Sequence, residues 1–339
     1  MRKFFLLFMA CLALSCNSVN SERERTGVRH AEYFDILDDG SLITISPYTH
    51  EADTVVIDRE MDTFVCMSTT HVAFLEYLGC DSTIKAVSGL SYVSSEALRS
   101  RNDVYDVGYE QELDYERILS LHPDAVFAYA VSAVEPPYVA KLKSLGVNVI
   151  MVNEHLEGTA LARAEYIRMF GALTGTMDRA DSLFAQVERR YDALKCNPDS
   201  MDRVKVLMNI PYEDQWFIPG GDNYMSHLVR DAGGEILGAK DGSRESSTVS
   251  VERAYLMAKE AQVWLNTGWC NTKAQLMSTN PVFSSFGIDR IYNNTLRTNP
   301  EGGNDFWESA VVRPDMVLED LRRIFRGEEG SFNYYLEVN

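Results

Sequence analysis

The sequence predicts an α/β protein made of two lobes that one long α-helix joins, and three observations support this prediction. Short apolar runs alternate with helical patterns on both sides of residues 160–195. Within residues 160–195, apolar residues recur at steps of three and four, which indicates one amphipathic helix. Apolar residues make up 45% of the 339-residue chain, enough for a core in each lobe and too many for a disordered chain.

The first half of the chain predicts a hairpin followed by alternating strands and helices. Residues 33–37 and 42–45 flank a turn that contains Gly40, so they form the hairpin. Gly79 and Gly146 mark the ends of two of the helices. Strands that alternate with helices are typical of parallel βαβ units. The strands are expected at residues 63–67, 84–87, 125–129 and 147–152, and the helices at residues 70–78, 114–121 and 137–145.

The helix over residues 160–195 is the most unusual predicted element. At 1.5 Å per residue it would be roughly 50 Å long, several times the average for a globular protein. Gly171 and Gly175 weaken the helical pattern and could break this helix in two. We place the helix and its flanks at residues 157–197, between an N-terminal lobe at 29–156 and a C-terminal lobe at 198–339.

The second half repeats the alternation and echoes the first. Asp114-Tyr115-Glu116-Arg117 and Ser250-Val251-Glu252-Arg253 open helices at matching distances from the strands that follow them. This internal similarity predicts that both lobes share one plan. Strands are expected at residues 204–208 and 263–266, and helices at residues 223–231, 250–258 and 314–325.

Residues 1–16 are typical of an export signal. Arg2 and Lys3 precede an apolar stretch of roughly eleven residues, which is shorter than the about 20 that a membrane-spanning helix needs. Ser15 before Cys16 resembles the lipobox of bacterial lipoproteins, so we expect lipidation of Cys16 and a polar tether over residues 17–28. Cys11 is a competing site with a poorer match, and the alternative is an ordinary secretory signal with an incidental cysteine.

Charge, cysteines and motifs exclude several classes of protein. The chain has 50 acidic and 32 basic residues, a formal net charge of −18, so it lacks the basic surface that nucleic acids or anionic lipid headgroups require. Cys66, Cys80, Cys196 and Cys270 form no C-x-x-C pair, so we expect buried thiols and no zinc or redox site. The absence of G-x-x-x-x-G-K-[ST], G-x-S-x-G and H-E-x-x-H patterns argues against an enzyme.

Three segments resemble one family of binding proteins. Residues 113–126 are similar to its E-x-I…L-x-P-D-x-V segment, residues 142–149 to its L-x-x-L-G-I-x-V segment, and residues 219–234 to its second-lobe helix with an A-G-G turn. The family is the class III periplasmic solute-binding proteins, the helical-backbone receptors of ABC importers for ferric siderophores, haem and cobalamin. The resemblance covers about residues 60–326 and leaves the hairpin as an N-terminal extension.

The resemblance implies a fold and a set of partners. It implies two Rossmann-like lobes, a rigid connecting helix, and a ligand cleft between the lobes at the carboxyl ends of the strands. The partners would be a membrane permease with its ATPase and a metal-chelate small molecule, with no nucleic acid. The protein would be an exported, periplasmic monomer without a cofactor of its own, held at a membrane through its lipid anchor only.

The candidate ligand-binding residues are those in loops that follow predicted strands. Tyr and Trp rings can cover the faces of a flat macrocycle or chelate, and they add a polar edge for hydrogen bonding. The alternative for any one aromatic residue is burial in a core. The candidates for ligand contact are Thr70, His71, Tyr92, Tyr109, Tyr129, Trp216, Phe217, Tyr224, Trp269, Asn304 and Trp307, with Ser88 and Tyr212 beside them.

Metal ligation by protein side chains is not expected. His71 at a helix start could coordinate a metal centre, but the favoured interpretation is a residue near the helix cap without a metal bond. The six histidines show no H-x-x-x-H spacing, and no set of His and carboxylate ligands is evident.

Glu116 and Glu252 are the candidate contacts to the permease. In the resembling family, one Glu on each lobe pairs with Arg residues of the permease, and these two residues fall at matching positions, one per lobe. Charges at the rim of an interface steer association more than they add affinity. The alternative is that each is a first-turn Glu that the helix dipole stabilises.

The expected ligand is a ferric siderophore or a corrinoid of the cobalamin type. A trianionic tris-catecholate chelate needs several basic groups, and the loops of the expected cleft carry only Arg297 and Arg313. Haem is left open. The alternatives in function are a surface lipoprotein that captures haem or another chelate for an outer-membrane receptor and, more remotely, an enzyme on a similar scaffold.

Overall fold

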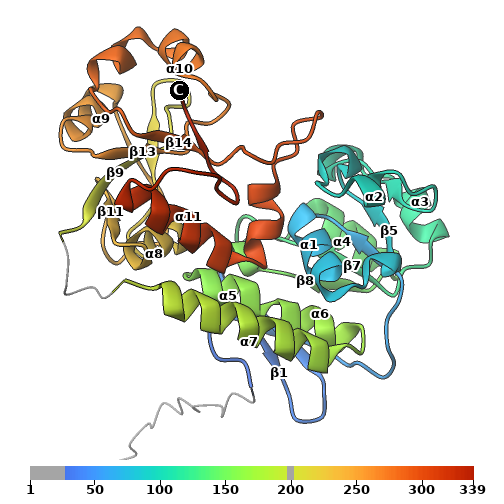
Figure 1. The fold of residues 1–339 in the computed structure, drawn as a ribbon. Helices are drawn as coiled ribbons and strands as arrows, with labels where there is room; N and C mark the ends of the chain where they lie inside the picture. The colour runs from blue at the N-terminus through green and yellow to red at the C-terminus, as the bar shows by residue number, and fades with distance from the viewer. Residues whose placement is uncertain (1–26, 197–201) are drawn as a thin grey trace, which may run out of the picture.

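The computed structural model describes residues 27–196 and 202–339, and two α/β lobes form its body (Figure 1). The first lobe contains a five-stranded parallel sheet in the order β6-β5-β4-β7-β8. Its elements are β4 (Phe64–Cys66), α1 (Thr69–Leu78), β5 (Ile84–Val87), α2 (Glu96–Arg99), β6 (Tyr105–Asp106), α3 (Tyr115–Ser120), β7 (Ala125–Ala128), α4 (Pro137–Ser144) and β8 (Val149–Met151), with the short 3-10 turns η1 (Asp81–Thr83), η2 (Leu90–Tyr92), η3 (Glu110–Glu112) and η4 (Glu154–Leu156).

The second lobe repeats this plan with the sheet order β11-β9-β13-β14-β15, in which only β15 is antiparallel to its neighbour. A two-stranded antiparallel ribbon, β10 with β12, lies beside this sheet. The elements are β9 (Val204–Met208), β10 (Trp216–Ile218), α8 (Tyr224–Asp231), β11 (Gly234–Ile236), β12 (Ser247–Val249), α9 (Val251–Ala258), β13 (Val263–Leu265), α10 (Lys273–Thr279), η5 (Pro281–Ser285), β14 (Ile291–Asn293), η6 (Asp305–Trp307), η7 (Ser309–Val311), α11 (Pro314–Arg326) and β15 (Leu336–Glu337).

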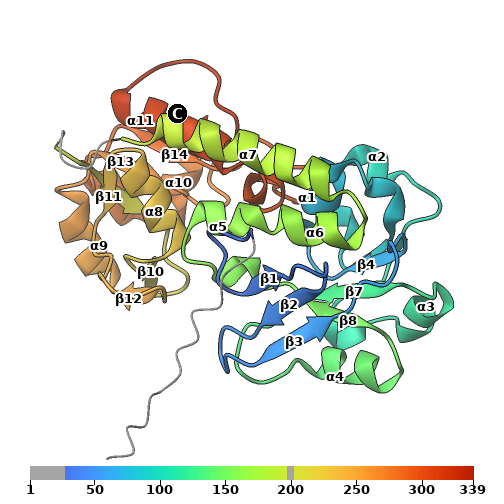
Figure 2. The ribbon, with the colours of Figure 1, turned by 90° about the horizontal axis from the view of Figure 1, so that it is seen from below.

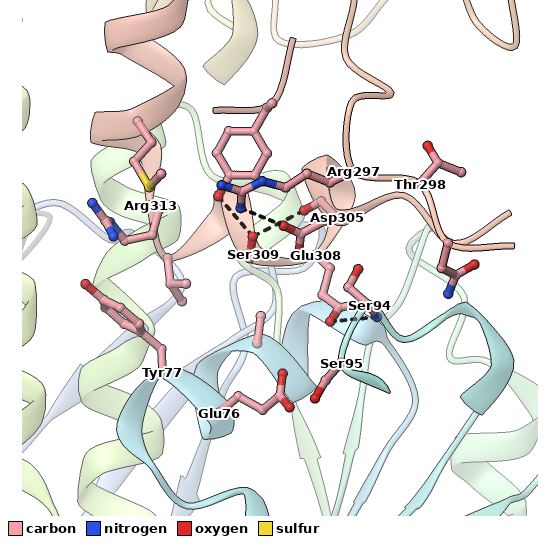
Figure 3. Close-up of a pocket in the computed structure, with 15 residues that line it drawn as sticks. Glu76, Tyr77, Ser94, Ser95, Arg297, Thr298, Asp305, Glu308, Ser309 and Arg313 are labelled. Carbon is pink, nitrogen blue, oxygen red and sulfur yellow. Dashed lines mark hydrogen bonds and ion pairs between the residues drawn. The ribbon is translucent and has the colours of Figure 1, made fainter. Parts of the chain in front are cut away.

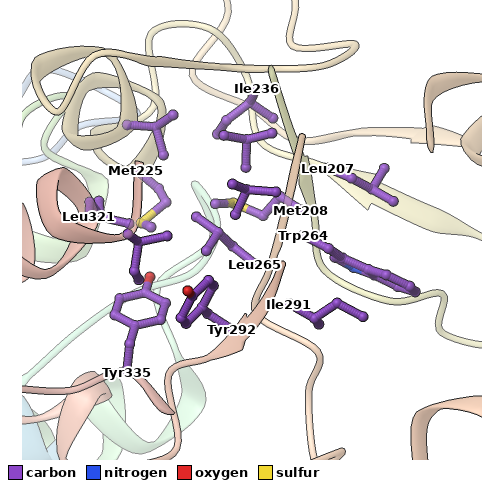
Figure 4. Packing of buried hydrophobic residues seen from close by; sticks show 14 of the residues in the cluster. Leu207, Met208, Met225, Ile236, Trp264, Leu265, Ile291, Tyr292, Leu321 and Tyr335 are labelled. Atoms are coloured by element: carbon purple, nitrogen blue, oxygen red, sulfur yellow. The ribbon is translucent and has the colours of Figure 1, made fainter. Parts of the chain in front are cut away.

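The central strands of both sheets are buried along their whole length. Every residue of β4, β7, β13 and β14 is buried, because helices cover both faces of each sheet. In the second lobe, Leu207, Trp264 and Ile291 come from three adjacent strands and pack in one core with residues of α8 and α11 (Figure 4). This explains why the strands read in the sequence as short continuous apolar runs.

The N-terminal hairpin is confirmed and is larger than the sequence predicts. β1 (Phe34–Ile36) and β2 (Leu42–Ile45) pair antiparallel, and β3 (Ala52–Val55) adds a third strand to β2. Three of the four residues of β3 are exposed, so this strand lacks the apolar alternation that reveals a strand in a sequence.

The prediction of a single long helix between the lobes is wrong. The segment forms α5 (Ala160–Glu165), α6 (Ile167–Leu173) and α7 (Met177–Leu194), and the chain reverses at Gly175, whose φ is 68°. Figure 2 shows α7 alongside α6, and the Arg168 side chain reaches across to Asp181 at 2.6 Å. The lobes therefore rest on a helical hairpin, which continues into the second lobe through the packing of α7 on α11.

The expectation of buried thiols is confirmed for two of the four cysteines of the described residues, since Cys80 and Cys196 are half-buried. Cys66, Cys80, Cys196 and Cys270 are all free thiols, and Cys66 and Cys270 are buried. Cys11 and Cys16 lie outside the described residues. Across residues 27–196 and 202–339, no helix combines the length and apolar character needed to cross a membrane.

Candidate ligand cleft

Polar side chains at the carboxyl edge of the first sheet are joined by hydrogen bonds. We call Ser68, Thr70 and Glu154 the polar floor of the cleft. Ser68 caps α1, and its Oγ lies 2.9 Å from Thr70 Oγ1. The Thr70 hydroxyl in turn donates to Glu154 Oε1 at 2.8 Å. Glu154 follows β8, so this bond links two parallel strand ends, as the topology of a parallel sheet requires.

Glu154 is a buried charge that its surroundings keep ionised. Burial alone would raise the pKa of its carboxyl, but His155, His71 and Arg163 outweigh burial and lower this pKa to about 2. The His155 ring shares a hydrogen bond with Ala130 O at 3.1 Å, and Tyr129 packs edge-on against it with 5.8 Å between ring centroids. Tyr129 therefore borders this floor, as expected for a residue after β7.

Exposed aromatic side chains follow the strands of both lobes. Large aromatic residues are usually buried, so an exposed set at strand ends marks a binding surface. Tyr92 and Tyr109 belong to the first lobe, and a Cβ placed on Gly302 of the second lobe would lie 3.9 Å from the Tyr92 ring. The exposed aromatic residues among the candidates are Tyr92, Tyr109, Tyr212, Phe217, Trp269 and Trp307.

A loop of the second lobe closes one side of the space between the lobes. The Asn299 side-chain amide donates to Ser91 O and Val93 O at 3.0 and 3.1 Å. The Glu308 carboxylate accepts the Ser94 backbone N–H with both oxygens, at 3.1 and 2.9 Å. We call residues 299–308 the junction loop, because these bonds join it to residues 91–94 of the first lobe.

A cavity of about 730 Å³ lies beside the junction loop, between α1 and α11 (Figure 3). It carries charges of both signs. Arg297 pairs with Asp305 at 3.0 Å and Arg313 with Asp315 at 2.9 Å, so both arginines that the sequence places here are already neutralised. The lining residues are Ala73, Glu76, Tyr77, Ser94, Ser95, Arg297, Thr298, Asn299, Asp305, Glu308, Ser309, Val312, Arg313, Met316 and Tyr334.

None of the predicted ligand-binding residues lines this cavity. A smaller pocket contains two of them, Tyr224 at the start of α8 and Trp307 of η6. The Arg163 side chain of α5 joins them there, with its guanidinium carbon 4.1 Å from the centre of the Tyr224 ring. The two pockets share no lining residue: the small one with Arg163 is mostly apolar, and the larger one beside the junction loop is lined mainly by polar residues.

Two predicted site residues are in the cores and expose no surface to a cleft ligand. His71 has no exposed surface and packs near Phe127 and Phe170, with burial lowering its pKa to about 4. Trp216 is equally buried, and its indole N–H donates to Met208 O at 2.7 Å. Both assignments to the cleft wall are therefore wrong, because neither side chain has any exposed surface.

The remaining candidates have mixed surroundings. Phe217 is the residue after Trp216 on β10, and the alternation of a strand brings it to the surface. Asn304 caps η6 by accepting the Phe306 N–H at 3.1 Å, so its side-chain oxygen is already in use.

Sequence reasoning missed Glu154, Glu308 and Arg163. Glu154 and Glu308 are charged residues in loops, where exposure is the normal expectation. Arg163 lies between two buried alanines of α5, and a charged residue of an amphipathic helix is normally expected on its solvent face. A signal that could have found Glu154 is its position directly after a predicted strand, the rule that selected the aromatic residues.

Glu116 and Glu252 occupy equivalent positions. Each is exposed in the first turn of its helix, α3 or α9. The capping residues Asp114 and Ser250 accept the backbone N–H of the Arg three positions later, at 2.8 and 3.3 Å. The match between the two halves therefore extends to the geometry of the helix starts.

Direct metal binding by the protein finds no support in the part of the chain that the structure describes. Within those residues, no group of three or more His, Cys, Asp or Glu side chains is arranged to hold a metal ion. A metal carried by a ligand needs no such group.

Two lobes with parallel sheets and facing aromatic strand ends define the class of two-lobe α/β binding proteins. The profile of the periplasmic binding protein family matches residues 65–287, more than half of the chain, and the chain belongs to this family. This is the superfamily that the sequence motifs suggest.

Sequence relatives are lipoproteins without an assigned ligand. An uncharacterized lipoprotein of Methanocaldococcus jannaschii is 25% identical over 311 residues, which covers 84% of this chain and 71% of the relative. A second uncharacterized lipoprotein of the same organism is 30% identical over 193 residues, covering 54% of this chain and 49% of the relative. The alignment thus spans about half the length of the second relative.

Solved structures share the fold. A periplasmic haem-binding protein from Pseudomonas aeruginosa superposes with a TM-score of 0.60 at 16% identity, over 82% of this chain and 98% of its own. The periplasmic vitamin B12-binding protein of Vibrio cholerae gives 0.57 at 15%, over 78% and 97%. The triscatecholate siderophore-binding protein of Bacillus subtilis gives 0.57 at 15%, over 84% and 98%. At such identities the likeness shows the fold alone.

Proposed function

We propose that this chain is the lipid-anchored substrate-binding protein of an ABC importer, and that it captures a metal chelate between its lobes. The observation that carries the proposal is the set of exposed aromatic residues at the strand ends of both lobes, in a member of the periplasmic binding protein family. Rings such as Tyr109, Tyr212, Trp269 and Trp307 offer broad apolar faces to a large flat ligand.

The chelate we propose is a corrinoid or a near-neutral ferric siderophore. Arg297 and Arg313 are each paired with an aspartate, which leaves them unable to offset several ligand charges without losing those partners. A trianionic tris-catecholate would therefore enter the cleft with most of its charge uncompensated. Haem is the second candidate, because its faces suit the same aromatic walls.

Calorimetric titration with cyanocobalamin, a ferric hydroxamate, haem and a ferric tris-catecholate tests the ligand class. We expect the tightest binding for one of the first two. Tightest binding of the tris-catecholate would overturn the charge argument, and failure of all four would overturn the chelate proposal. Mass spectrometry of ligand copurified from the native host gives an independent identification.

The anchor is tested by changing its cysteine. We expect Cys16→Ser to abolish lipidation and to move the protein from the detergent phase to the aqueous phase in phase partitioning. A variant with both Cys11 and Cys16 replaced controls for the competing site. Continued detergent partitioning of that double variant would contradict the anchor.

A further inference from the structure

Arg163 lies where the two lobes meet. It belongs to α5, the helix that follows the first lobe, and it lines a pocket with Tyr224, Trp307 and Ala310 of the second lobe. Thr159 caps α5 by accepting the Ala162 N–H at 3.2 Å, which fixes the start of the helix. The Tyr224 ring holds the Arg163 side chain in this small pocket.

The guanidinium of Arg163 is oriented but makes no direct ion pair among the described residues. It stacks over Tyr224 at 4.1 Å, and no carboxylate of the described residues pairs with it within 4.0 Å. Its Nε is buried and has no hydrogen-bond partner among those residues. Glu154 acts on it only through the longer-range electrostatic interaction, since the Glu154 carboxylate accepts its hydrogen bond from Thr70.

Arg163 differs from the other arginines of the described residues that lack a carboxylate partner. Those that are not exposed donate to backbone carbonyls, namely Arg99, Arg203, Arg230, Arg290 and Arg322, whereas half-buried Arg163 has no such acceptor among the described residues. The protein has 50 acidic residues against 32 basic ones, and the two arginines of the neighbouring cavity are both paired. Leaving a partly buried cation without an acceptor costs free energy, and the planar guanidinium is suited to bind carboxylate or phosphate oxygens two at a time. The donor set of Arg163 is thus free for an acceptor from outside the chain.

We propose that Arg163 binds one acidic group, a carboxylate or a phosphate, at the edge of the chelate that the cleft captures. This inference rests on the proposed function and adds to it a specificity-determining residue and a ligand charge. Tyr224 holds the guanidinium plane, and the exposed ring of Trp307 beside it covers the adjoining apolar part of the ligand. One free arginine fits one acidic group, which agrees with a chelate of low net charge.

Matched pairs of chelates that differ in an acidic group test the inference. The pairs are haem and its dimethyl ester, cobinamide phosphate and cobinamide, and the N-succinyl and N-acetyl derivatives of ferrioxamine B. We expect the wild-type protein to bind the acidic member of at least one pair about tenfold to a hundredfold more tightly than its partner. The first and third pairs report a carboxylate, and the second reports a phosphate.

Variants assign the preference to Arg163. Arg163→Gln should abolish the preference within that pair, and Arg163→Lys should retain part of it. The control Arg189→Gln, at an exposed position of α7 away from both pockets, should leave the preference unchanged. Equal weakening of both members of the pair by Arg163→Gln would show a structural role and overturn the inference. If the variant fails to fold, the relative affinity of the wild-type protein for the two members of each pair still tests whether an acidic group is recognised.

The two proposals fail in distinguishable ways. Binding of chelates by the wild type with no preference within any pair would overturn the role of Arg163 and leave the proposed function intact. Binding of none of the six chelates would overturn the proposed function, and the assignment of Arg163 with it.

Discussion

Buried carboxylates connect segments that lie far apart in this chain. Glu165 accepts the backbone N–H groups of residues 29–31 at 2.6–2.9 Å, and Glu157 accepts those of residues 32–33 at 2.9–3.0 Å. Glu308 does the same for Ser94 across the two lobes. Because a buried carboxylate without donors is costly, each of these residues fixes the position of the segment that supplies its donors.

Glu308 is expected to make the stability of the protein dependent on pH. Burial raises its pKa to about 8, from an ordinary value of 4.5. The folded protein therefore holds a proton that the unfolded chain has lost, and the stability contributed by that proton falls as the pH rises from about 4.5 through 8. We expect Glu308→Gln to gain stability relative to wild type over this window, by on the order of a few kcal/mol at pH 9.

Thermal or denaturant unfolding between pH 5 and pH 9 measures this difference. Glu157, whose pKa burial raises to about 7, titrates in the same window in both proteins and cancels in the comparison. Glu301→Gln, at an exposed position of the same junction loop, is the matched control, and its stability should follow that of the wild type across this pH range because it keeps Glu308. A stability difference between wild type and Glu308→Gln that stays constant from pH 5 to 9 would contradict the assignment.

Two tryptophan residues also show what the sequence alone cannot predict. Trp216 and Trp269 both lie in segments that follow strands of the second lobe, yet one is fully buried and the other largely exposed. An aromatic side chain is compatible with either surrounding, and the choice depends on Phe283 and Phe286, which reach Trp216 from a distant part of the chain. Local pattern carries no information on such contacts.

At the level of elements, the helical hairpin explains why the spacing of apolar residues predicted one continuous helix. The apolar residues of α6 face the first lobe and those of α7 face α6 and α11, so both helices show steps of three and four. The turn between α6 and α7 is short, so it hardly interrupts the spacing of apolar residues by three and four positions. The sequence therefore predicted the helical content correctly. It indicated the reversal of the chain only through Gly175, which weakens the helical pattern.

Gly171 is expected to be required for the close approach of α6 and α7. A Cβ placed on Gly171 would lie 2.5 Å from the Cβ of Ala180, closer than atoms pack. Gly→Ala within a helix normally stabilises by about 0.5–1 kcal/mol. Here we expect Gly171→Ala to destabilise the protein by about 1–3 kcal/mol, because the two helices must separate. Denaturant unfolding at constant pH measures the change.

A double-mutant cycle identifies the contact. In the background of Ala180→Gly, which removes the opposing methyl group, Gly171→Ala should cost less than it does in the wild type. Additive effects of the two substitutions, or a stabilising Gly171→Ala, would show that the helices are not packed this closely.

The sequence indicates a loop at Gly302 and Gly303 but does not predict that this junction loop contacts the first lobe. The loop has no periodicity, and its role comes from bonds between residues more than 200 positions apart, such as those of Asn299 to Ser91 and Val93. Gly303 is needed there, since a Cβ would meet Tyr92 O at 2.0 Å. A glycine-rich loop signals a turn in the sequence, but not the surface on which the loop rests.

At the scale of the molecule, the two lobes repeat one arrangement. Each sheet has its first strand near the centre and later strands added outward, and the helix starts at Glu116 and Glu252 share capping geometry. The sequence predicted this repetition from a short Glu-Arg match. It is the arrangement most readily predicted, because buried parallel strands and capped helices leave local patterns, whereas the placement of Arg163 and of the junction loop depends on how the lobes meet.

The repeated arrangement suggests how the whole molecule could engage a membrane permease. Two exposed carboxylates, one on each lobe, can contact a partner at two points only while the lobes hold a fixed relative position. Charged groups at the rim of an interface act mainly on the rate and orientation of association. Docking would then respond to the spacing of the lobes, which the junction loop and the helical hairpin maintain.

Reversal of both charges tests this docking. We expect Glu116→Arg with Glu252→Arg to abolish uptake by cells that carry the importer while ligand affinity of the purified protein stays unchanged, because attraction at the permease becomes repulsion. The control is Glu96→Arg with Asp178→Arg, which changes the net charge equally and alters two other acidic residues in the first turns of helices. Uptake by the control should continue. Normal uptake by the first variant would remove the docking role, and a loss of ligand affinity would instead place these two residues at the cleft.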